Sequence, residues 1–97
     1  MPKGYIIGEI EVTNLAGYET YRRQSPKIAE QFGGRYLVRG GDAKLLEGVE
    51  SIKRPVVIEF ESYERALAFY TSPEYQEILP HRLENVKTMR LICADGI

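Results

Sequence analysis

Two glutamates and two arginines are the residues of this chain best suited to carry chemistry. Glu9 and Glu59 lie in two segments of alternating apolar and polar residues, and Arg39 and Arg90 lie in two others. Like charges that lie close together raise the pKa of one carboxyl group, whereas a nearby arginine lowers it. A carboxylate placed in this way can transfer a proton, and an arginine can bind an anionic group of a substrate. We therefore predict a polar pocket formed by these residues together with Tyr5.

The segments that hold these residues have the period of β-strands. They cover residues 4–12, 35–39, 55–61 and 89–94, and the last strand is expected to begin near residue 87. Because successive side chains of a strand point to opposite faces, the alternation predicts a sheet with two different surfaces. The apolar surface, which helices are expected to cover, contains Ile6, Gly8, Ile10, Val12, Tyr36, Val38, Val56, Ile58, Phe60, Met89, Leu91 and Cys93. The mixed surface contains Tyr5, Ile7, Glu9, Glu11, Arg35, Leu37, Arg39, Val57, Glu59, Glu61, Arg90 and Ile92.

A first helix is predicted after the first strand. Asn14 can cap it, and Gly33 with Gly34 can end it, because glycine tolerates the left-handed conformation of a helix C-terminus. Pro26 lacks the N–H group that an interior helical turn needs, so a kink or a short break is expected there. The helical stripe that faces the sheet is expected to contain Tyr18, Tyr21, Ser25, Ile28 and Phe32.

A second helical region is predicted in two pieces. Ser62 can cap the first piece, and Ser72 followed by Pro73 is typical of a new helix start. Between the second and third strands, residues 44–47 are expected to be extended and residues 48–54 to form the return loop. The element order is therefore β-α-β-β-α-β, which is that of a ferredoxin-like α+β fold with an antiparallel four-stranded sheet. We predict a single ferredoxin-like domain over residues 1–97, with the strands in spatial order four, one, three, two.

In this topology both helical regions cover the same face of the sheet, and the mixed surface stays open. A monomer would expose its apolar residues to water as one patch, and such patches mark interaction or ligand sites. Pairing with a second copy would bury the apolar residues and enclose the charged ones, and two-fold symmetric pairing is the commonest form of oligomer. We therefore predict a homodimer whose two sheets enclose a shared cavity.

Composition argues against several other classes of function. The net charge is −1, with 28% charged residues spread along the chain, so nucleic-acid binding is not expected. No segment has the roughly 20 apolar residues of a membrane span, so we expect no membrane partner. Cys93 is the single cysteine and is expected to be a small core residue of a cytoplasmic protein. His81, the single histidine, has no partner at metal-binding or nucleophilic spacing, and we predict no metal and no cofactor.

Three segments resemble the motifs of a known family. They are Gly33-Gly34-Arg35-Tyr36-Leu37-Val38-Arg39-Gly40-Gly41, then Val57-Ile58-Glu59-Phe60, and then Phe69-Tyr70 with Ser72-Pro73-Glu74-Tyr75-Gln76. Together they resemble the bacterial family known as domain of unknown function 1330, within the dimeric α+β barrel superfamily. The positions that match the family's motifs are Arg35, Tyr36, Arg39, Gly40, Gly41, Glu59, Tyr70, Tyr75 and Arg82. The resemblance implies a ferredoxin-like protomer and a barrel-forming dimer, and it implies no particular activity.

The sequence leaves two functions open. The first is binding, without catalysis, of a small anionic or aromatic metabolite between the two sheets. The second is a cofactor-independent reaction in the same cavity, of the isomerase or monooxygenase kind found in the wider superfamily, which is an analogy of fold alone. The charged residues could also form a paired network that only fixes strand register and secures the dimer. If they bind a ligand, Arg39→Ala and Glu59→Gln are both expected to abolish binding and leave the dimer intact.

Overall fold

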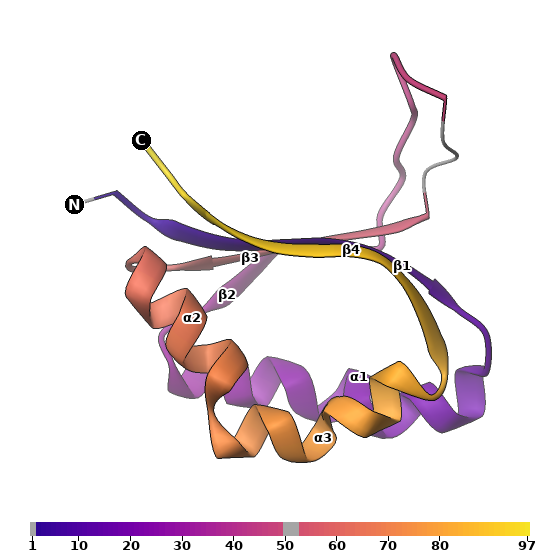
Figure 1. Cartoon of the computed structure of the whole chain (residues 1–97), viewed down its shortest axis with the longest axis horizontal. Helices are drawn as coiled ribbons and strands as arrows, with labels where there is room; N and C mark the ends of the chain where they lie inside the picture. The colour runs from indigo at the N-terminus through magenta and orange to yellow at the C-terminus, as the bar shows by residue number, and fades with distance from the viewer. Residues whose placement is uncertain (1, 50–52) are drawn as a thin grey trace.

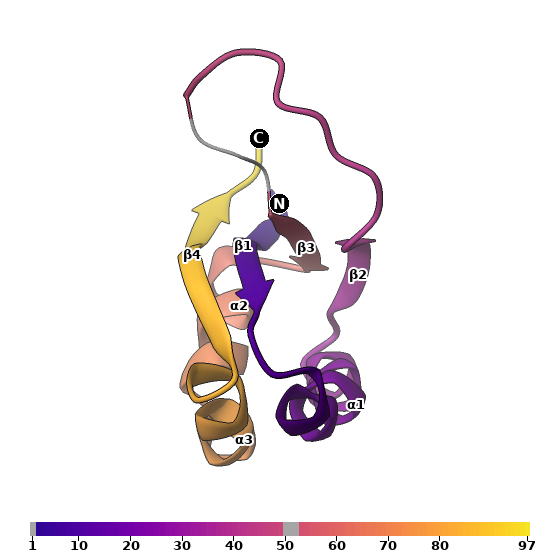
Figure 2. The ribbon, with the colours of Figure 1, turned by 90° about the vertical axis from the view of Figure 1, so that its right-hand side faces the viewer.

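The computed structural model describes residues 2–49 and 53–97 and shows one antiparallel sheet with its helices on a single face (Figure 1). The sheet has the strand order β2-β3-β1-β4, which is the predicted order. The elements along the chain are β1 (Gly4–Val12), α1 (Leu15–Gln31), β2 (Arg35–Arg39), β3 (Arg54–Phe60), α2 (Tyr63–Thr71), α3 (Pro73–Leu83) and β4 (Val86–Asp95). This confirms the predicted α+β ferredoxin-like fold. Figure 2 shows α1 beneath the β2 side of the sheet and α3 beneath the β4 side.

The core lies between the sheet and the helices. Phe60 of β3 is 1% exposed and packs against Phe69 of α2, which is 2% exposed, with ring centroids 5.2 Å apart. Phe69 in turn lies 4.7 Å from the ring of Tyr75 in α3. Alternate residues of β1, including Ile6 and Ile10, are buried on the same side. The helix-facing surface is therefore apolar for most of its length, as the alternation predicts.

The helix starts follow the predicted capping residues. The side-chain oxygens of Asn14, Ser62 and Ser72 accept hydrogen bonds from backbone N–H groups three residues ahead, at 3.3, 3.1 and 3.1 Å. Each bond satisfies one of the N–H groups that have no partner within the helix. Of the two alternatives expected at Pro26, the short break is wrong, since α1 continues through this residue to Gln31, and the kink stays a prediction. A proline removes one helical hydrogen bond, and here the carbonyl four residues earlier, that of Arg22, accepts from the Arg39 guanidinium instead.

A β-bulge changes the face of the residues at the end of β2. Tyr36 pairs with Ile58, but Val38 pairs with Val57, so one residue of β2, Leu37, has no partner in β3. A shift of one residue moves every following side chain to the other face of a sheet. Arg39 therefore turns toward the helices and Val38 turns away from them, and the predicted faces of both residues are wrong.

Two further expectations need correction. Met89 is expected on the apolar surface, but β4 has a shift like that of β2. Glu9 pairs with Arg90 whereas Ile10 pairs with Thr88, which leaves Met89 unpaired and 36% exposed. No strand forms at residues 44–47, and the described part of the β2–β3 connection is irregular and rises on the side of the sheet away from the helices (Figure 1). The expected loop at 48–54 includes residues 50–52, which lie outside the described residues, and its last residue, Arg54, already belongs to β3.

Candidate functional site

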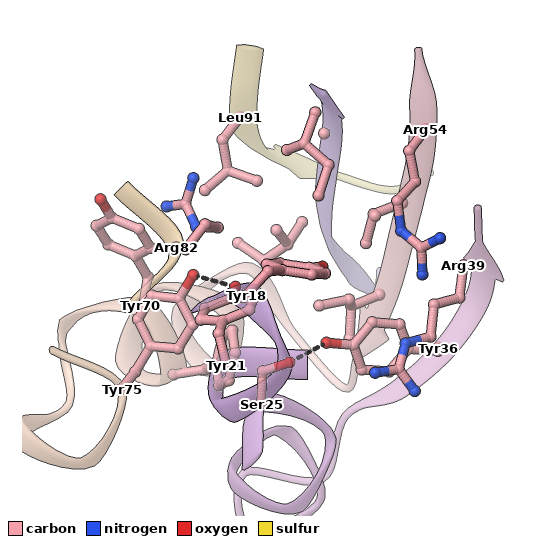
Figure 3. Close-up of a pocket in the computed structure, with 16 residues that line it drawn as sticks. Tyr18, Tyr21, Ser25, Tyr36, Arg39, Arg54, Tyr70, Tyr75, Arg82 and Leu91 are labelled. Atoms are coloured by element: carbon pink, nitrogen blue, oxygen red, sulfur yellow. Dashed lines mark hydrogen bonds between the residues drawn. The ribbon is translucent and has the colours of Figure 1, made fainter. Parts of the chain in front are cut away.

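A pocket lies between the sheet and the helices, on the covered face of the sheet rather than on the open face where the sequence predicts one (Figure 3). Its wall on the sheet side is apolar and consists of Ile6, Gly8, Ile10, Val56, Ile58 and Leu91. Its other walls hold tyrosines of α1, β2, α2 and α3 and three arginines, namely Tyr18, Tyr21, Tyr36, Tyr70, Tyr75, Arg39, Arg54 and Arg82. The space open to the centre of a water molecule is about 30 Å³, which is room for roughly two or three waters.

Two pairs of hydroxyl groups lie along the helix side of this pocket. The phenols of Tyr21 and Tyr75 share a hydrogen bond of 2.6 Å, and Ser25 Oγ lies 2.9 Å from the phenol of Tyr36 (Figure 3). The helical spacing of residues 18, 21 and 25 places them on one face of α1. Burial raises the pKa of Tyr21 well above its ordinary value, and the adjacent Tyr75 raises it further. Burial likewise raises the pKa values of Tyr36 and Tyr75, so all three phenols stay protonated at neutral pH.

Arg82, in the last turn of α3, places a positive charge in the interior. Its residue is 4% exposed, Nη1 donates a 2.6 Å hydrogen bond to Thr88 Oγ1, and Cζ lies 5.7 Å from the ring centroid of Tyr21. Its Nε is buried and has no hydrogen-bond partner among the residues that the structure describes. Burial acts to lower the pKa of Arg82, but Tyr75 and Tyr21 outweigh it and raise the pKa, so the guanidinium stays charged. No carboxylate of residues 2–49 or 53–97 forms an ion pair with it.

Arg39 and Arg54 lie at the side of the pocket opposite Arg82 (Figure 3). Arg39 Cζ lies 5.0 Å from the ring centroid of Tyr36, and its Nη2 donates to the backbone carbonyl of Arg22. Arg54 Nε is buried without a hydrogen-bond partner. Gly40 has a φ of 72°, and a Cβ at this position would overlap the Arg54 guanidinium. A glycine is therefore favoured here by the backbone conformation, and the Arg54 guanidinium packs against it.

A second, open hollow borders the pocket between α2, α3 and β4. The space in it open to the centre of a water molecule is about 400 Å³, and its wall is mostly apolar, with Leu67, Leu83, Ile92 and Cys93. The two cavities share Ile6, Tyr70, Arg82 and Leu91. Arg82 therefore lines both cavities.

The residues predicted for the pocket are divided between the two faces of the sheet. Tyr5, Glu9, Glu59 and Arg90 lie on the open face, whereas Arg39 lies on the covered face because of the bulge. Glu9 and Arg90 are cross-strand neighbours with Nε and Oε2 3.9 Å apart. Tyr5 is likewise the cross-strand neighbour of Glu59 and donates it a 3.2 Å hydrogen bond. On the open face these four residues therefore form two cross-strand pairs.

The positions that match the family's motifs divide in the same way. Tyr36, Tyr70, Tyr75 and Arg82 line the covered pocket with Arg39, and Gly40 packs beside it. Arg35 instead pairs with Glu59 on the open face, with Nε 3.1 Å from Oε1. Gly41 has no neighbour that an added Cβ would meet. The polar pocket residues that the sequence analysis does not assign to a site are Tyr18, Tyr21, Ser25 and Arg54. The helical stripe of the first three is equally typical of a core, and Arg54 is expected in the loop before β3.

The remaining reactive side chains lie outside the pocket. His81 is exposed, and its backbone carbonyl accepts a 2.8 Å hydrogen bond from Asn85. Cys93 is half-buried against the core, and this burial raises the pKa of its thiol, with a further contribution from Asp95. No three His, Cys, Asp or Glu side chains of the described residues gather as a metal site would require. In the same part of the chain, every helix is too short or too polar to span a bilayer.

Comparisons with known proteins agree with this architecture. The sequence profile of the family described as "Domain of unknown function (DUF1330)" matches residues 3–97, and no curated protein matches the sequence. The chain is similar to the crystal structure of RPA0582, a protein of unknown function from Rhodopseudomonas palustris, with 20% identity, a TM-score of 0.74, and coverage of 99% of this chain and 83% of that one. It is also similar to HapK from Hahella chejuensis, with 10% identity, a TM-score of 0.62, and coverage of 97% and 92%. These identities are low, so the likeness concerns the fold.

Proposed function

Because the chain belongs to the family described as "Domain of unknown function (DUF1330)", whose description assigns no activity, we propose a function from the pocket itself. It is the binding of a small metabolite that has an anionic group and an aromatic or apolar body. The observation that carries this proposal is Arg82, a guanidinium that is 4% exposed and forms no ion pair within the described residues. The proposed site lies between the sheet and the helices, and not between two sheets.

A buried cation without a counter-charge is costly, which supports a role for Arg82 beyond packing. Charges taken out of water lose several kcal/mol of solvation even after relaxation. An anionic ligand would supply the missing charge and could accept from Arg82 Nε, which has no partner in the structure. The rings of Tyr21 and Tyr75 and the side chain of Leu91 would pack on the body of the ligand.

Binding is better supported than acid–base catalysis. A general base needs a pKa near the working pH. The ionisable side chains among the described lining residues are tyrosines and arginines, and the pKa values of Tyr21, Tyr36 and Tyr75 are raised by burial. Such groups can hold a ligand and donate hydrogen bonds to it, but at neutral pH they cannot accept a proton. The isomerase alternative would therefore need a base from elsewhere, and no observation on the pocket favours a monooxygenase.

The test is titration of the purified protein with benzoate and with benzamide, its neutral analogue of the same shape. Benzoate is expected to bind and benzamide to bind much more weakly, because a charge-assisted hydrogen bond contributes about 1.5–3 kcal/mol. A ligand at about one hundred times its Kd stabilises the folded state by about 2.7 kcal/mol, which a thermal-shift assay detects.

Two variants separate the pocket from the opposite face of the sheet. Arg82→Met is expected to abolish the response to benzoate. Glu59→Gln, on the open face, is the matched control and is expected to respond as the wild type does. The proposal is refuted if benzoate and benzamide behave alike, or if Arg82→Met binds benzoate as the wild type does.

We also propose that the open face of the sheet pairs with the same face of a second copy. Leu37 is 47% exposed and Ile92 is 50% exposed, and Ile7 and Val57 lie between them on the central strands. Such an apolar patch is unfavourable in water. Light scattering after size-exclusion chromatography is expected to give twice the chain mass of 11.1 kDa, and Val57→Glu is expected to yield monomers. A monomeric wild type at micromolar concentration would remove this proposal and leave the pocket unaffected.

A further inference from the structure

At each of two opposite sides of the pocket lies an arginine whose buried Nε has no hydrogen-bond partner among the described residues. Within the described residues, the buried side-chain nitrogen and oxygen atoms that lack a hydrogen-bond partner are Arg54 Nε and Arg82 Nε. Both arginines line the same pocket. Figure 3 shows Arg82 on one side and Arg54 with Arg39 on the other. Buried polar groups in proteins nearly always have a partner, so two exceptions around one pocket point to a ligand that supplies partners for both.

The surroundings of the two arginine groups are alike. On one side, Arg82 lies over the ring of Tyr21, whose phenol bonds to that of Tyr75. On the other side, Arg39 lies over the ring of Tyr36, whose phenol bonds to Ser25. Each side thus combines a guanidinium, which can donate two parallel hydrogen bonds to a carboxylate, with hydroxyl groups that can donate a further one.

No acidic side chain of residues 2–49 or 53–97 forms an ion pair with either group. The ion pairs of the described residues involve Arg22, Arg23, Arg35, Lys53 and Arg90, all with glutamates outside the pocket. Arg39, Arg54 and Arg82 are thus three cations around one pocket without a carboxylate partner among those residues. A ligand with one negative charge would satisfy only one side and leave the buried Nε of the arginine on the other side without a partner among the described residues.

From this geometry we propose that the ligand is a dianion with an anionic group at each end of a flat apolar body, such as a dicarboxylate. One anionic group binds Arg82, and the other binds Arg54 together with Arg39. This inference rests on the proposed function and deepens it by naming the class of ligand. The space of about 30 Å³ that the free protein offers is smaller than such a ligand, so binding requires the pocket to open. Arg39 is exposed at its edge and can move with the second anionic group as it opens.

The experiment compares benzoate with its three diacid analogues, phthalate, isophthalate and terephthalate, by isothermal titration calorimetry. These ligands share one ring and differ in the number and spacing of the carboxylates. At least one diacid is expected to bind the wild type about 10- to 100-fold more tightly than benzoate, the equivalent of one further charge-assisted hydrogen bond. The spacing that binds best reports the distance between the two arginine groups.

Variants then assign the second anionic group. In Arg54→Met the advantage of the diacid over benzoate is expected to disappear, whereas in Arg82→Met both ligands are expected to lose binding. Arg39→Met, which changes an exposed side chain, is expected to reduce the affinity of the diacid relative to benzoate. It takes the place of Arg54→Met in the test if that variant does not fold. Arg65→Met, an exposed arginine on α2 away from the pocket, is the control that keeps the wild-type ratio.

The outcomes separate this inference from the proposed function. If benzoate binds but no diacid binds more tightly, the dianion is refuted and the simple anion site stands. The same conclusion holds if the diacid advantage survives both Arg54→Met and Arg39→Met. If neither benzoate nor any diacid binds the wild type, the proposed function fails, and this inference fails with it.

Discussion

Replacing Arg82 with methionine is expected to make the ligand-free protein more stable while it abolishes anion binding. The guanidinium is 4% exposed and has no ion-pair partner in the described part of the chain. Its burial costs several kcal/mol. In return it gains a hydrogen bond to Thr88, about 1.5–3 kcal/mol for a charged donor, and a cation–π contact with Tyr21 of roughly 0.5–2 kcal/mol.

Methionine removes both the cost and the gains and fills a similar volume. Replacing buried ionic groups by apolar ones of like size often stabilises a protein by about 1–4 kcal/mol. Because Arg82 keeps one good hydrogen bond to Thr88, we expect the lower part of this range, about 1–2 kcal/mol. In a domain of this size such a change raises Tm by roughly 4–16 °C.

The assay is thermal and urea unfolding of the ligand-free protein, with Arg65→Met as the matched control. Arg65 Cζ lies 5.2 Å from the ring centroid of Phe32, a contact like that of Arg82 with Tyr21, but Arg65 is exposed. Its replacement loses only this contact and is expected to destabilise the protein by up to about 1 kcal/mol. If Arg82→Met lowers Tm as much as Arg65→Met or more, Arg82 is a structural residue, and the reasoning that makes it a ligand-binding cation is refuted.

Two other perturbations test the walls of the pocket. Gly40→Ala is expected to lower stability by about 1–2 kcal/mol in urea unfolding, because an alanine is strained at a φ of 72° and its Cβ overlaps Arg54; an unchanged midpoint would contradict this role of the glycine. In an alkaline titration, Tyr21, Tyr36 and Tyr75 have pKa values raised by burial, so the folded state holds protons that the unfolded state releases above about pH 10. The free energy of unfolding is therefore expected to be unaffected by these groups below that pH and to fall above it. The tyrosinate absorbance of these three residues is expected to rise only as the protein unfolds. Ionisation of all tyrosines near pH 10 in a protein that stays folded would show that the three phenols are not buried.

The order and type of the elements can be predicted because their signals are local. Alternation within a strand depends only on neighbouring residues, and a capping side chain bonds to a backbone group three residues ahead. Asn14, Ser62 and Ser72 begin the helices where the sequence predicts. The break expected at Pro26 is wrong for a non-local reason, since a distant arginine bonds to the carbonyl that the proline leaves free.

The location of the site could not be predicted, because it depends on a bulge. Residue types in β2 alternate regularly, so Arg39 is assigned to the open face with Glu59. The single extra residue, Leu37, moves Arg39 to the covered face and leaves Glu59 with its cross-strand neighbours. Gly40 and Gly41 do signal an irregular backbone, but the irregularity begins three residues before Gly40, and its effect on the facing side chains cannot be read from glycines alone.

Two departures from regular structure meet at the Arg39 side of the pocket, and this argues that the pocket is selected for use. Neither a bulge at Leu37 nor a proline within α1 improves the core, since each removes backbone hydrogen bonds. Together they bring Arg39 to the carbonyl of Arg22 and hold it beside Tyr36. Sequences that break local rules without a gain in packing commonly do so at functional sites. The aromatic stripe of α1 is typical of an ordinary core. The arginines that line the pocket have no ion-pair partner among the described residues; a core has no need of such groups, whereas an anionic ligand would need them.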